Sequence, residues 1–561
     1  MTTRSLRLLP LLAALAAAFV LPSPAAPALE LRQGDHVALV GGGLADRLQH
    51  SGWLEAMIHA SQPKQGLVFR NLGFTGDEVL ARQRSENFGS PDDWLKRVQA
   101  DVIWAFFGFN ESFKGEAGVD KFKQDLEKWI TDTRKQDYSG RGAPRLVLFS
   151  PIAAEKHSDP NMADPASINA GLKPYVQAMA EVAKAQGVLF VDLFAASQKA
   201  YGQARQSLTI NGIHLSDEGY RALAPAMYEA LFGGQAPSTD GAAFTKLRGA
   251  VNDKNAVWFS RYRTVDGYNV FGGRSALAYQ PGKGGFISDR NAAAPHISNY
   301  KVMQREMSQR DVMTANRDAR IWAVAQGGDL VVKDDNLPEA IEVESNKPGT
   351  KPDKSHVFLG GEEAIARMKV PAGCKVNLFA DEKMFPDLVN PVQMAFDTKG
   401  RLWVAAWLNY PERRPTSKKG DSLLIFEDTN NDGKADKCWP FIDDLNCPTG
   451  FQFYKDGVIV VQAPDVWFVR DTDGDGRADW KERILNGMDS ADSHHTANAL
   501  CLDPGGAIYL SDGVFHRTQV ETALGPVRNH DGAIYRFEPR ASKFERYIDR
   551  KSTRLNSSHR T

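Results

Sequence analysis

The chain has 561 residues, of which 42% are hydrophobic, 24% charged and 10% aromatic. At roughly 150 residues per domain, this length excludes a single compact module, and the composition excludes intrinsic disorder and a collagen-like repeat. Lysine and arginine together number 68, and aspartate and glutamate 69. A balance so close to neutral provides no electrostatic footprint for nucleic acid or an anionic membrane. Any binding partner must therefore be argued from local sites.

Residues 1–28 have the layout of a secretory signal peptide. Arg4 and Arg7 precede an apolar run at 8–20, and small residues follow as far as Ala28. The run is shorter than the roughly 20 residues that span a bilayer, which makes a membrane anchor the less favoured alternative. No other stretch is long and apolar enough to cross a membrane. We therefore expect a periplasmic or secreted protein.

Residues 549–561 differ in character from everything before them and resemble the translation of a sequencing-library adapter. We interpret them as an artefact and expect the gene product to continue beyond this point. Without 1–28 and 549–561, 62 basic and 68 acidic residues remain, a formal charge of −6. The mature chain is therefore mildly acidic.

Residues 29–235 alternate short apolar runs with helical spacing. The spacing of Val119, Phe122, Leu126 and Ile130 is typical of an amphipathic helix. Strand-like runs occur at 37–40, 102–107, 146–149 and 188–191. Such alternation predicts a three-layer α/β domain with a parallel sheet between helices.

Two further regions precede the C-terminal third. Residues 236–332 contain apolar positions at helical spacing, which predicts a helical extension packed on the first domain. The methionines in it favour core packing over a cofactor site; the positions are Tyr300, Met303, Met307, Met313 and Ile321. Residues 333–356 are rich in Lys, Asp, Pro and Ser, a composition typical of a linker.

Residues 357–548 contain an internal repeat in which an Asp and a Gly precede an alternating apolar run. The repeat glycines are Gly400, Gly457 and Gly506, spaced 57 and 49 residues apart. Strands separated by glycine turns at a period near 50 are typical of propeller blades. About three blades fit, and such folds need about four to eight to close. We therefore predict an incomplete all-β propeller.

Four short motifs of the first domain stand at 41–43, 71–77, 108–111 and 211–214. In their order they resemble those of the SGNH (GDSL-like) hydrolases, which are flavodoxin-like. The turn at Gly43 stands where that family has its nucleophilic serine. The resemblance implies that Gly73 and Asn110 donate to an oxyanion and that His214 is the base. Asn211 stands where the family has the aspartate that orients the base.

Acyl transfer needs a nucleophile, a base, an orienting group for the base and donors for the developing negative charge. Gly43 has no hydroxyl, and Asn211 cannot stabilise an imidazolium as a carboxylate does. We favour a disabled or weakened hydrolase. A nucleophile displaced to Thr75 or Ser112, or water activated by His214, is an alternative, and a purely structural role of Asn110 and His214 is another.

Two acidic loops have the spacing of oxygen ligands for Ca²⁺, with a glycine where the chain turns sharply. The stronger loop ends in a Glu suited to bidentate binding; its ligands are Asp471, Asp473, Asp475, Asp479 and Glu482. The earlier copy has Trp439 in place of that Glu; its ligands are Asp428, Asn430, Asp432 and Asp436. We expect both loops to connect strands, with Ca²⁺ in the stronger one. The alternative is a metal-free turn in which Asp and Gly set the geometry.

The segment around His495 resembles the part of soluble quinoprotein sugar dehydrogenases that carries a catalytic histidine, which makes His495 the candidate base. The regions together resemble bacterial proteins of the planctomycete and verrucomicrobial type, in which an SGNH-like domain is joined to a "membrane-bound dehydrogenase" propeller and often a haem module. The resemblance implies a PQQ-like quinone or haem in the complete protein and a haem-bearing electron acceptor. A structural role for His495 is the alternative.

Four cysteines lie in the C-terminal third. An oxidising compartment permits disulfides, and Cys438 with Cys447 is the favoured pair, with free thiols equally compatible. The preferred interpretation is an exported carbohydrate-acting protein, dehydrogenase-like in its propeller and impaired in its SGNH domain. The alternatives are an esterase or deacetylase acting on polysaccharide esters and a non-catalytic glycan-binding module. Carbohydrate or another small molecule is the expected substrate, and nucleic acid is not an expected partner.

Overall fold

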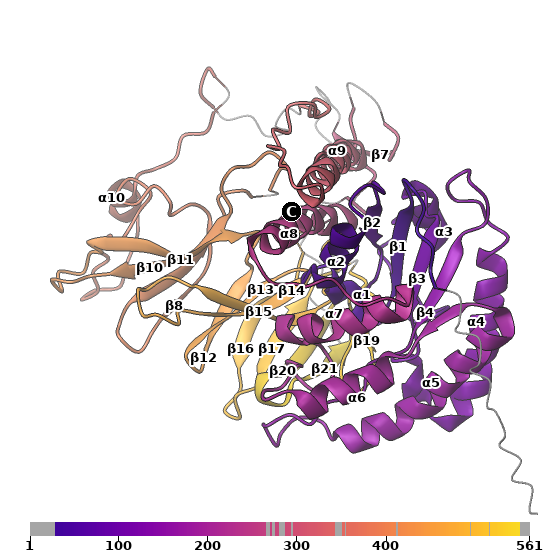
Figure 1. Cartoon of the computed structure of the whole chain (residues 1–561). Helices are drawn as coiled ribbons and strands as arrows, with labels where there is room; N and C mark the ends of the chain where they lie inside the picture. Colours follow the sequence, from indigo (N-terminus) through magenta and orange to yellow (C-terminus); the bar gives the residue numbers. More distant parts are fainter. Residues whose placement is uncertain are drawn as a thin grey trace, which may run out of the picture.

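The computed structural model describes residues 28–549 except 265–269, 272–274, 280–285, 293–295, 343–349, 354, 411–412, 494 and 515. All but one residue of the predicted signal peptide and all but one residue of the predicted artefact therefore lie outside the described residues. An N-terminal α/β part, indigo to magenta in Figure 1, lies against a set of β-sheets in orange and yellow.

A five-stranded sheet forms the centre of the N-terminal part. Its order is β2-β1-β3-β4-β5, and every pairing is parallel. The strands are β1 (His36–Gly41), β2 (Val68–Asn71), β3 (Val102–Phe106), β4 (Arg145–Phe149) and β5 (Leu189–Val191). Four of them overlap the four predicted runs, which confirms the predicted α/β fold with a parallel sheet.

Helices cover both faces of this sheet because successive strand residues point to opposite sides. Val37 and Leu39 of β1 belong to one apolar cluster, and Ala38 and Val40 to another. The helices are α1 (Gly43–Leu48), α2 (Trp53–Ser61), α3 (Pro91–Arg97), α4 (Val119–Thr133), α5 (Pro165–Gln186), α6 (Leu193–Gln203) and α7 (Asp217–Phe232), with 3₁₀ turns at Glu111–Lys114 and Glu116–Gly118.

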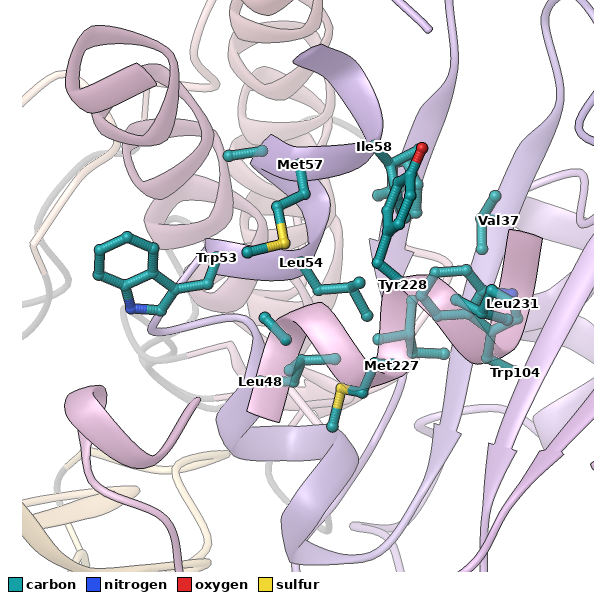
Figure 2. Packing of buried hydrophobic residues seen from close by; sticks show 14 of the residues in the cluster. Val37, Leu48, Trp53, Leu54, Met57, Ile58, Trp104, Met227, Tyr228 and Leu231 are labelled. Carbon is teal, nitrogen blue, oxygen red and sulfur yellow. The ribbon is translucent and has the colours of Figure 1, made fainter. Parts of the chain in front are cut away.

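The first cluster joins α2 and α7 to the sheet. Figure 2 shows part of it, with Leu54 and Met57 of α2 beside Met227 of α7. The second cluster lies on the opposite face and includes Phe122, Leu126 and Ile130 of α4, the positions that the helical spacing predicted. Burial on both faces makes the sheet the rigid support of the loops that follow its strands.

Two long helices follow, α8 (Ala242–Arg263) and α9 (Asn299–Ala325), with a small hairpin of β6 (Leu277–Tyr279) and β7 (Phe286–Ser288) between them. The two helices pack against each other. α9 covers the predicted helical stretch, and Met303 and Met307 are core residues, as their spacing predicted. Part of the expected linker lies along α9, where Arg317 pairs with Asp334 at 2.9 Å.

The C-terminal part contains three four-stranded antiparallel sheets preceded by α10 (Gly361–Ala366). The first consists of β8 (Pro391–Phe396), β9 (Leu402–Ala406), β10 (Asp421–Glu427) and β11 (Lys437–Leu445). The second consists of β12 (Gly450–Tyr454), β13 (Gly457–Gln462), β14 (Asp465–Arg470) and β15 (Trp480–Asn486). The third consists of β16 (Asn498–Leu502), β17 (Ile508–Asp512), β20 (Ala533–Glu538) and β21 (Lys543–Asp549), with a 3₁₀ turn at Pro539–Ala541.

The sequence repeat falls at the same place in each sheet. Gly400, Gly457 and Gly506 lie at the hairpins that join the first strand of a sheet to the second. Three four-stranded sheets equal the predicted number of blades, while their closure into a propeller stays a prediction. A short hairpin of β18 (Gln519–Val520) and β19 (Val527–Arg528) is inserted between β17 and β20.

The favoured Cys438–Cys447 disulfide is wrong, because the two cysteines lie at opposite ends of the nine-residue strand β11. Cys438 is the second residue of β11 and Cys447 follows its end. An extended strand rises about 3.3 Å per residue, which carries the two thiols out of bonding range. No helix in the described part of the chain is long and apolar enough to cross a membrane.

Candidate functional site

Gly43, Asn110 and His214 of the predicted catalytic set meet at the carboxyl-terminal edge of the parallel sheet, where ligands of α/β folds bind. Gly43 follows β1 and Asn110 follows β3, while His214 lies in the loop before α7. The turn after β1 requires glycine at Gly41, because its φ is +128° and a Cβ there would lie 2.1 Å from the carbonyl oxygen of Phe106. The chain thus turns sharply at the point where the SGNH motif places its nucleophile.

A carboxylate from the C-terminal part occupies this site. Glu521 follows β18, and its carboxyl oxygen Oε2 accepts hydrogen bonds from the Gly43 N–H at 2.9 Å and from Asn110 Nδ2 at 2.7 Å. The N–H of Gly76 approaches the same oxygen at 3.4 Å. The other oxygen, Oε1, lies 3.2 Å from His214 Nε2. Glu521 is 5% exposed, so these contacts take the place of water.

Asn211 fixes which nitrogen of His214 carries the proton. The side-chain oxygen of Asn211 accepts the backbone N–H groups of Ile213 at 3.3 Å and His214 at 3.0 Å. That network orients the amide, so its NH₂ group is directed at His214 Nδ1, 3.1 Å away. Nδ1 must therefore accept, and the proton of the neutral ring resides on Nε2. His214 thus donates to Glu521 and has no lone pair on Nε2 with which to act as a base.

The protonation states agree with this arrangement. Burial lowers the pKa of His214 below its ordinary value, and the charge of Arg47 acts in the same direction, against the opposing effect of Glu521. Burial alone would raise the pKa of Glu521, but hydrogen bonds from His214, Gly43 and Asn110 outweigh it and hold that pKa below its ordinary value. At neutral pH the pair is therefore a neutral imidazole and a carboxylate.

Other candidate residues have different partners. The N–H of Gly73 donates to Asn71 Oδ1 at 2.8 Å within its own loop, and Gly76 supplies the N–H that the family resemblance assigned to Gly73. Thr75 Oγ1 accepts the backbone N–H of Glu521 at 3.1 Å. Ser112 Oγ donates to the carbonyl of Phe109 at 2.7 Å. The two hydroxyls considered as displaced nucleophiles are therefore engaged elsewhere.

The β18–β19 hairpin is held by several contacts besides Glu521. We call residues 519–528 the docking hairpin. Gln519 Nε2 donates to the carbonyl of Thr75 and to Asp77 Oδ1, both at 2.9 Å. At its other end Arg528 pairs with Glu78 at 2.9 Å. These contacts position the backbone that carries Glu521 against the loop after β2.

A second set of polar contacts joins α1 to the second sheet. Asp46 Oδ2 accepts from Asn486 Nδ2 at 2.7 Å, and Arg47 donates to the carbonyl of Arg483 at 2.9 Å. Asp46 also pairs with Arg263 at 2.8 Å. The carboxyl-terminal edge of the parallel sheet is therefore covered by the C-terminal part.

The two acidic loops connect strands, as predicted. Residues 428–436 join β10 to β11, and residues 471–479 join β14 to β15. In the second loop the ligand atoms of Asp471, Asp473 and Asp475 lie within 4.8 Å of one another. Asp479 accepts the N–H of Thr472 at 2.8 Å. Glu482 lies outside this group on β15, where burial raises its pKa.

The first loop repeats the same internal contacts. Asp436 accepts the N–H of Thr429 at 2.9 Å, and Asp428 accepts the N–H of Gly433 at 2.9 Å. Asn430 Nδ2 donates to Asp432 at 3.2 Å. These contacts set the turn geometry, so carboxylate oxygens of both loops already accept hydrogen bonds from backbone N–H groups.

His495 lies apart from His214, before β16. Its Nδ1 is 3.1 Å from Asp492 Oδ2, a carboxylate contact that orients an imidazole for proton transfer. A second histidine of this region, His516, is fully buried and contacts Asp512 Oδ1 at 2.6 Å. The negative charge of Asp512 outweighs burial and raises the pKa of His516 to about 9.

Comparison with known proteins separates the two parts. Residues 38–222 match the family model described as GDSL-like Lipase/Acylhydrolase family. This segment is a GDSL-like lipase/acylhydrolase domain. Residues 360–559 match a model described only as a domain of unknown function, DUF7133. No curated protein matches the chain.

Solved structures similar to the GDSL-like domain include three hydrolases. A Parabacteroides merdae protein described as a GDSL-like lipase is 13% identical, with 36% of this chain and 99% of that chain covered, at a TM-score of 0.30. An acetylxylan esterase from Geobacillus stearothermophilus is 16% identical, with 36% and 96% covered, at 0.28. An alpha/beta hydrolase, LAE5, from the metagenome of Lake Arreo, Spain, is 18% identical, with 36% and 96% covered, at 0.27.

Glu521 was not predicted as a site residue. It is 307 positions from His214 in the chain, and the residues around it form no motif of the SGNH type. The signal in the sequence was indirect, since Gly43 and Asn211 both depart from the family pattern. Two such departures in one site mark it as different from the family pattern, but they do not point to position 521.

Proposed function

We propose that the GDSL-like domain is hydrolytically silent and belongs to an exported, carbohydrate-acting protein. One observation carries the proposal. The position of the family nucleophile has no side chain, and His214 presents an N–H to the carboxylate that fills the space in front of it. A base must accept a proton from the attacking group. A His214 protonated on Nε2 cannot do so.

The serine-protease triad indicates the magnitude of the impairment. Replacing the orienting aspartate by asparagine there lowers kcat about 10⁴-fold, because it stabilises the wrong tautomer. Asn211 creates the same tautomer here. The missing nucleophile and the carboxylate at the donors add to that loss, so ester turnover is expected at background level.

The test is hydrolysis of 4-nitrophenyl acetate by the full chain. Wild type and His214→Ala should have equal rates. A combined Gly43→Ser, Asn211→Asp, Glu521→Ala variant restores the nucleophile, the orienting group and the space. It should gain on the order of 10²-fold, the lower end of what a positioned acid–base group contributes. Wild-type turnover that His214→Ala abolishes would overturn the proposal.

An esterase acting on polysaccharide esters is the second candidate. The retained donors favour it, since the Gly43 N–H and Asn110 Nδ2 converge on one oxygen as they would on an oxyanion. The proton of His214 and the buried carboxylate of Glu521 argue against it. Activity of wild type on acetylated xylan, lost in Asn110→Ala, would favour this candidate.

We assign the chemistry to the C-terminal part, which we propose is a dehydrogenase-like propeller that oxidises a sugar or alcohol with a quinone or haem partner. Three antiparallel four-stranded sheets and the His495–Asp492 contact support this proposal. A quinone would accept the electrons when bound, and His495 would remove the proton of the substrate hydroxyl. Dye reduction by sugars after quinone addition, lost in His495→Ala and retained in His157→Ala, is the expected result.

Calcium binding belongs to the same proposal. The carboxylates of Asp471, Asp473 and Asp475 gather in one loop, and Ca²⁺ favours six to eight oxygen ligands. Calorimetric titration with Ca²⁺ should show binding to wild type that Asp473→Asn weakens. Asp432→Asn in the first loop is the matched control and should leave this binding unchanged. Equal titration curves for wild type and Asp473→Asn would contradict the assignment.

A further inference from the structure

We infer that the former catalytic pocket of the GDSL-like domain is a carboxylate receptor, and that its ligand in this chain is the side chain of Glu521. The inference rests on the proposed loss of hydrolysis and adds what the pocket binds instead. It also assigns a task to the docking hairpin, which is to join the two parts of the protein through one buried anion.

The polar groups that contact the carboxylate are all donors. Oε2 receives the Gly43 N–H, Asn110 Nδ2 and the Gly76 N–H, and Oε1 receives His214 Nε2. An ionised carboxylate has only acceptors, so donors on both oxygens match it and would not match a neutral amide. Hydrogen bonds to a charged group are about twice as strong as neutral ones. The pocket therefore selects a carboxylate on chemical grounds.

Both departures from the catalytic pattern serve this ligand. A Cβ at Gly43 would lie 2.3 Å from Glu521 Oε1 and 2.9 Å from its Cδ, so any residue with a side chain collides with the carboxylate. Asn211 holds the proton of His214 on the nitrogen that faces Oε1. A serine and an aspartate at these positions would remove the space and the donor together.

Contacts around the carboxylate hold the rest of the ligand. The backbone N–H of Glu521 donates to Thr75 Oγ1 at 3.1 Å, and Gln519 binds the same loop through the Thr75 carbonyl. A cavity of about 20 Å³ adjoins the carboxylate and is lined in part by Phe106, Phe107 and Phe109. So small a cavity leaves little room beyond the carboxylate itself, and the chemical class that the receptor takes is therefore a short-chain carboxylate, supplied here by the chain itself.

Acetate is the probe for the receptor. Glu521→Ala removes a CH₂–COO⁻ group, which is acetate in size and charge, and leaves the hairpin backbone in place. Sodium acetate should raise the thermal midpoint of this variant relative to sodium chloride at equal ionic strength. At ten times its Kd, acetate raises the ratio of folded to unfolded protein about elevenfold. Wild type, whose pocket is filled, should show no difference between the salts.

Two controls show whether the response depends on charge and on the donors. Acetamide has the shape of acetate without the charge and should have no effect on Glu521→Ala. Adding Asn110→Ala to that variant removes a donor to the anion and should weaken acetate binding at least tenfold, since a hydrogen bond to a charged group contributes about 1.5–3 kcal/mol. Equal midpoints in acetate and chloride, or an equal response of wild type, would overturn the inference.

Glu521→Gln provides a second approach if the alanine variant does not fold. The glutamine side chain fills the pocket with nearly the same volume, so acetate has no space to bind and should not change the thermal midpoint. The midpoint itself should fall below that of wild type, because the amide lacks the charge that the donors recognise. A midpoint equal to that of wild type would show that the charge is not recognised and would also overturn the inference. Failure here leaves the ester assay unaffected, whereas ester turnover by wild type refutes the proposed silence without changing the acetate result.

Discussion

Exchanging Glu521 for glutamine tests the tautomer of His214 directly. The amide keeps one oxygen for the donors at Oε2, but its NH₂ group then faces the N–H of His214, so two donors meet. Losing a hydrogen bond to a charged group costs about 1.5–3 kcal/mol, and an unsatisfied buried donor costs about 1–3 kcal/mol. We expect Glu521→Gln to destabilise the folded chain by about 3 kcal/mol at pH 7.

A second exchange should reverse part of this loss. An aspartate at position 211 can still accept the two backbone N–H groups with one oxygen, while its other oxygen accepts a proton from His214 Nδ1. His214 Nε2 then becomes an acceptor and can receive the NH₂ group of the introduced glutamine. Because the mismatch disappears and a neutral hydrogen bond worth about 1 kcal/mol forms, Asn211→Asp should restore about 2 kcal/mol in the Glu521→Gln background.

The assay is thermal unfolding of wild type, both single variants and the double variant, arranged as a double-mutant cycle. The single variant Asn211→Asp is the control for effects that do not involve Glu521. A double variant no more stable than Glu521→Gln would refute the tautomer assignment. Additive effects of the two exchanges would do so as well, because the reasoning requires the sites to be coupled through the ring of His214.

Three further predictions concern buried charges and one close approach. The pKa of His516 rises from 6.5 to about 9 on folding, so its contact with Asp512 should stabilise the protein by about 3 kcal/mol below pH 6.5. This stability is lost as the pH rises through 9, and His516→Gln should flatten that part of a plot of thermal midpoint against pH. Burial alone would raise the pKa of Glu55, but the charge of Lys254 outweighs burial and lowers that pKa from 4.5 to about 2. The free energy of unfolding should therefore fall by about 3 kcal/mol as the pH drops through this interval. If Glu55→Gln unfolds on acidification at the same pH as wild type, this reasoning is contradicted. At Gly487 the φ is +107° and a Cβ would lie 1.9 Å from the carbonyl oxygen of Gln519, so Gly487→Ala should lower the free energy of unfolding by at least about 2 kcal/mol. Gly474→Ala, where a Cβ meets nothing, is the control and should lower it by less.

Much of the fold could be predicted because its signals are local. The strands β1, β3 and β4 are buried on both faces, which gives continuous apolar runs, and α4 shows its apolar side at regular spacing. The strand β2 was missed because it is only four residues long and contains Arg70 and Asn71. Arg70 pairs with Asp318 of α9, and a tertiary contact of this kind cannot be predicted from the residues next to β2 in the sequence.

The site was predictable only in part for the same reason. Asn110 and His214 follow recognisable motifs, and the structure brings them together around one carboxylate. The carboxylate itself comes from a hairpin in another part of the chain, and its presence depends on how the two parts dock. The role of Gly73 could not be read from its motif either, because backbone N–H directions at a turn depend on the neighbouring side chain of Asn71.

The crowding at Gly43 has a consequence for how this domain can change over generations. A serine placed there meets a carboxylate oxygen only 2.3 Å from its Cβ, so a nucleophile at this position forces the Glu521 side chain away from its hydrogen-bond donors. Losing the glutamate first empties a buried cluster of donors. Neither exchange alone is therefore favourable, and placing a serine nucleophile here depends on the removal of a glutamate 478 positions further along the chain.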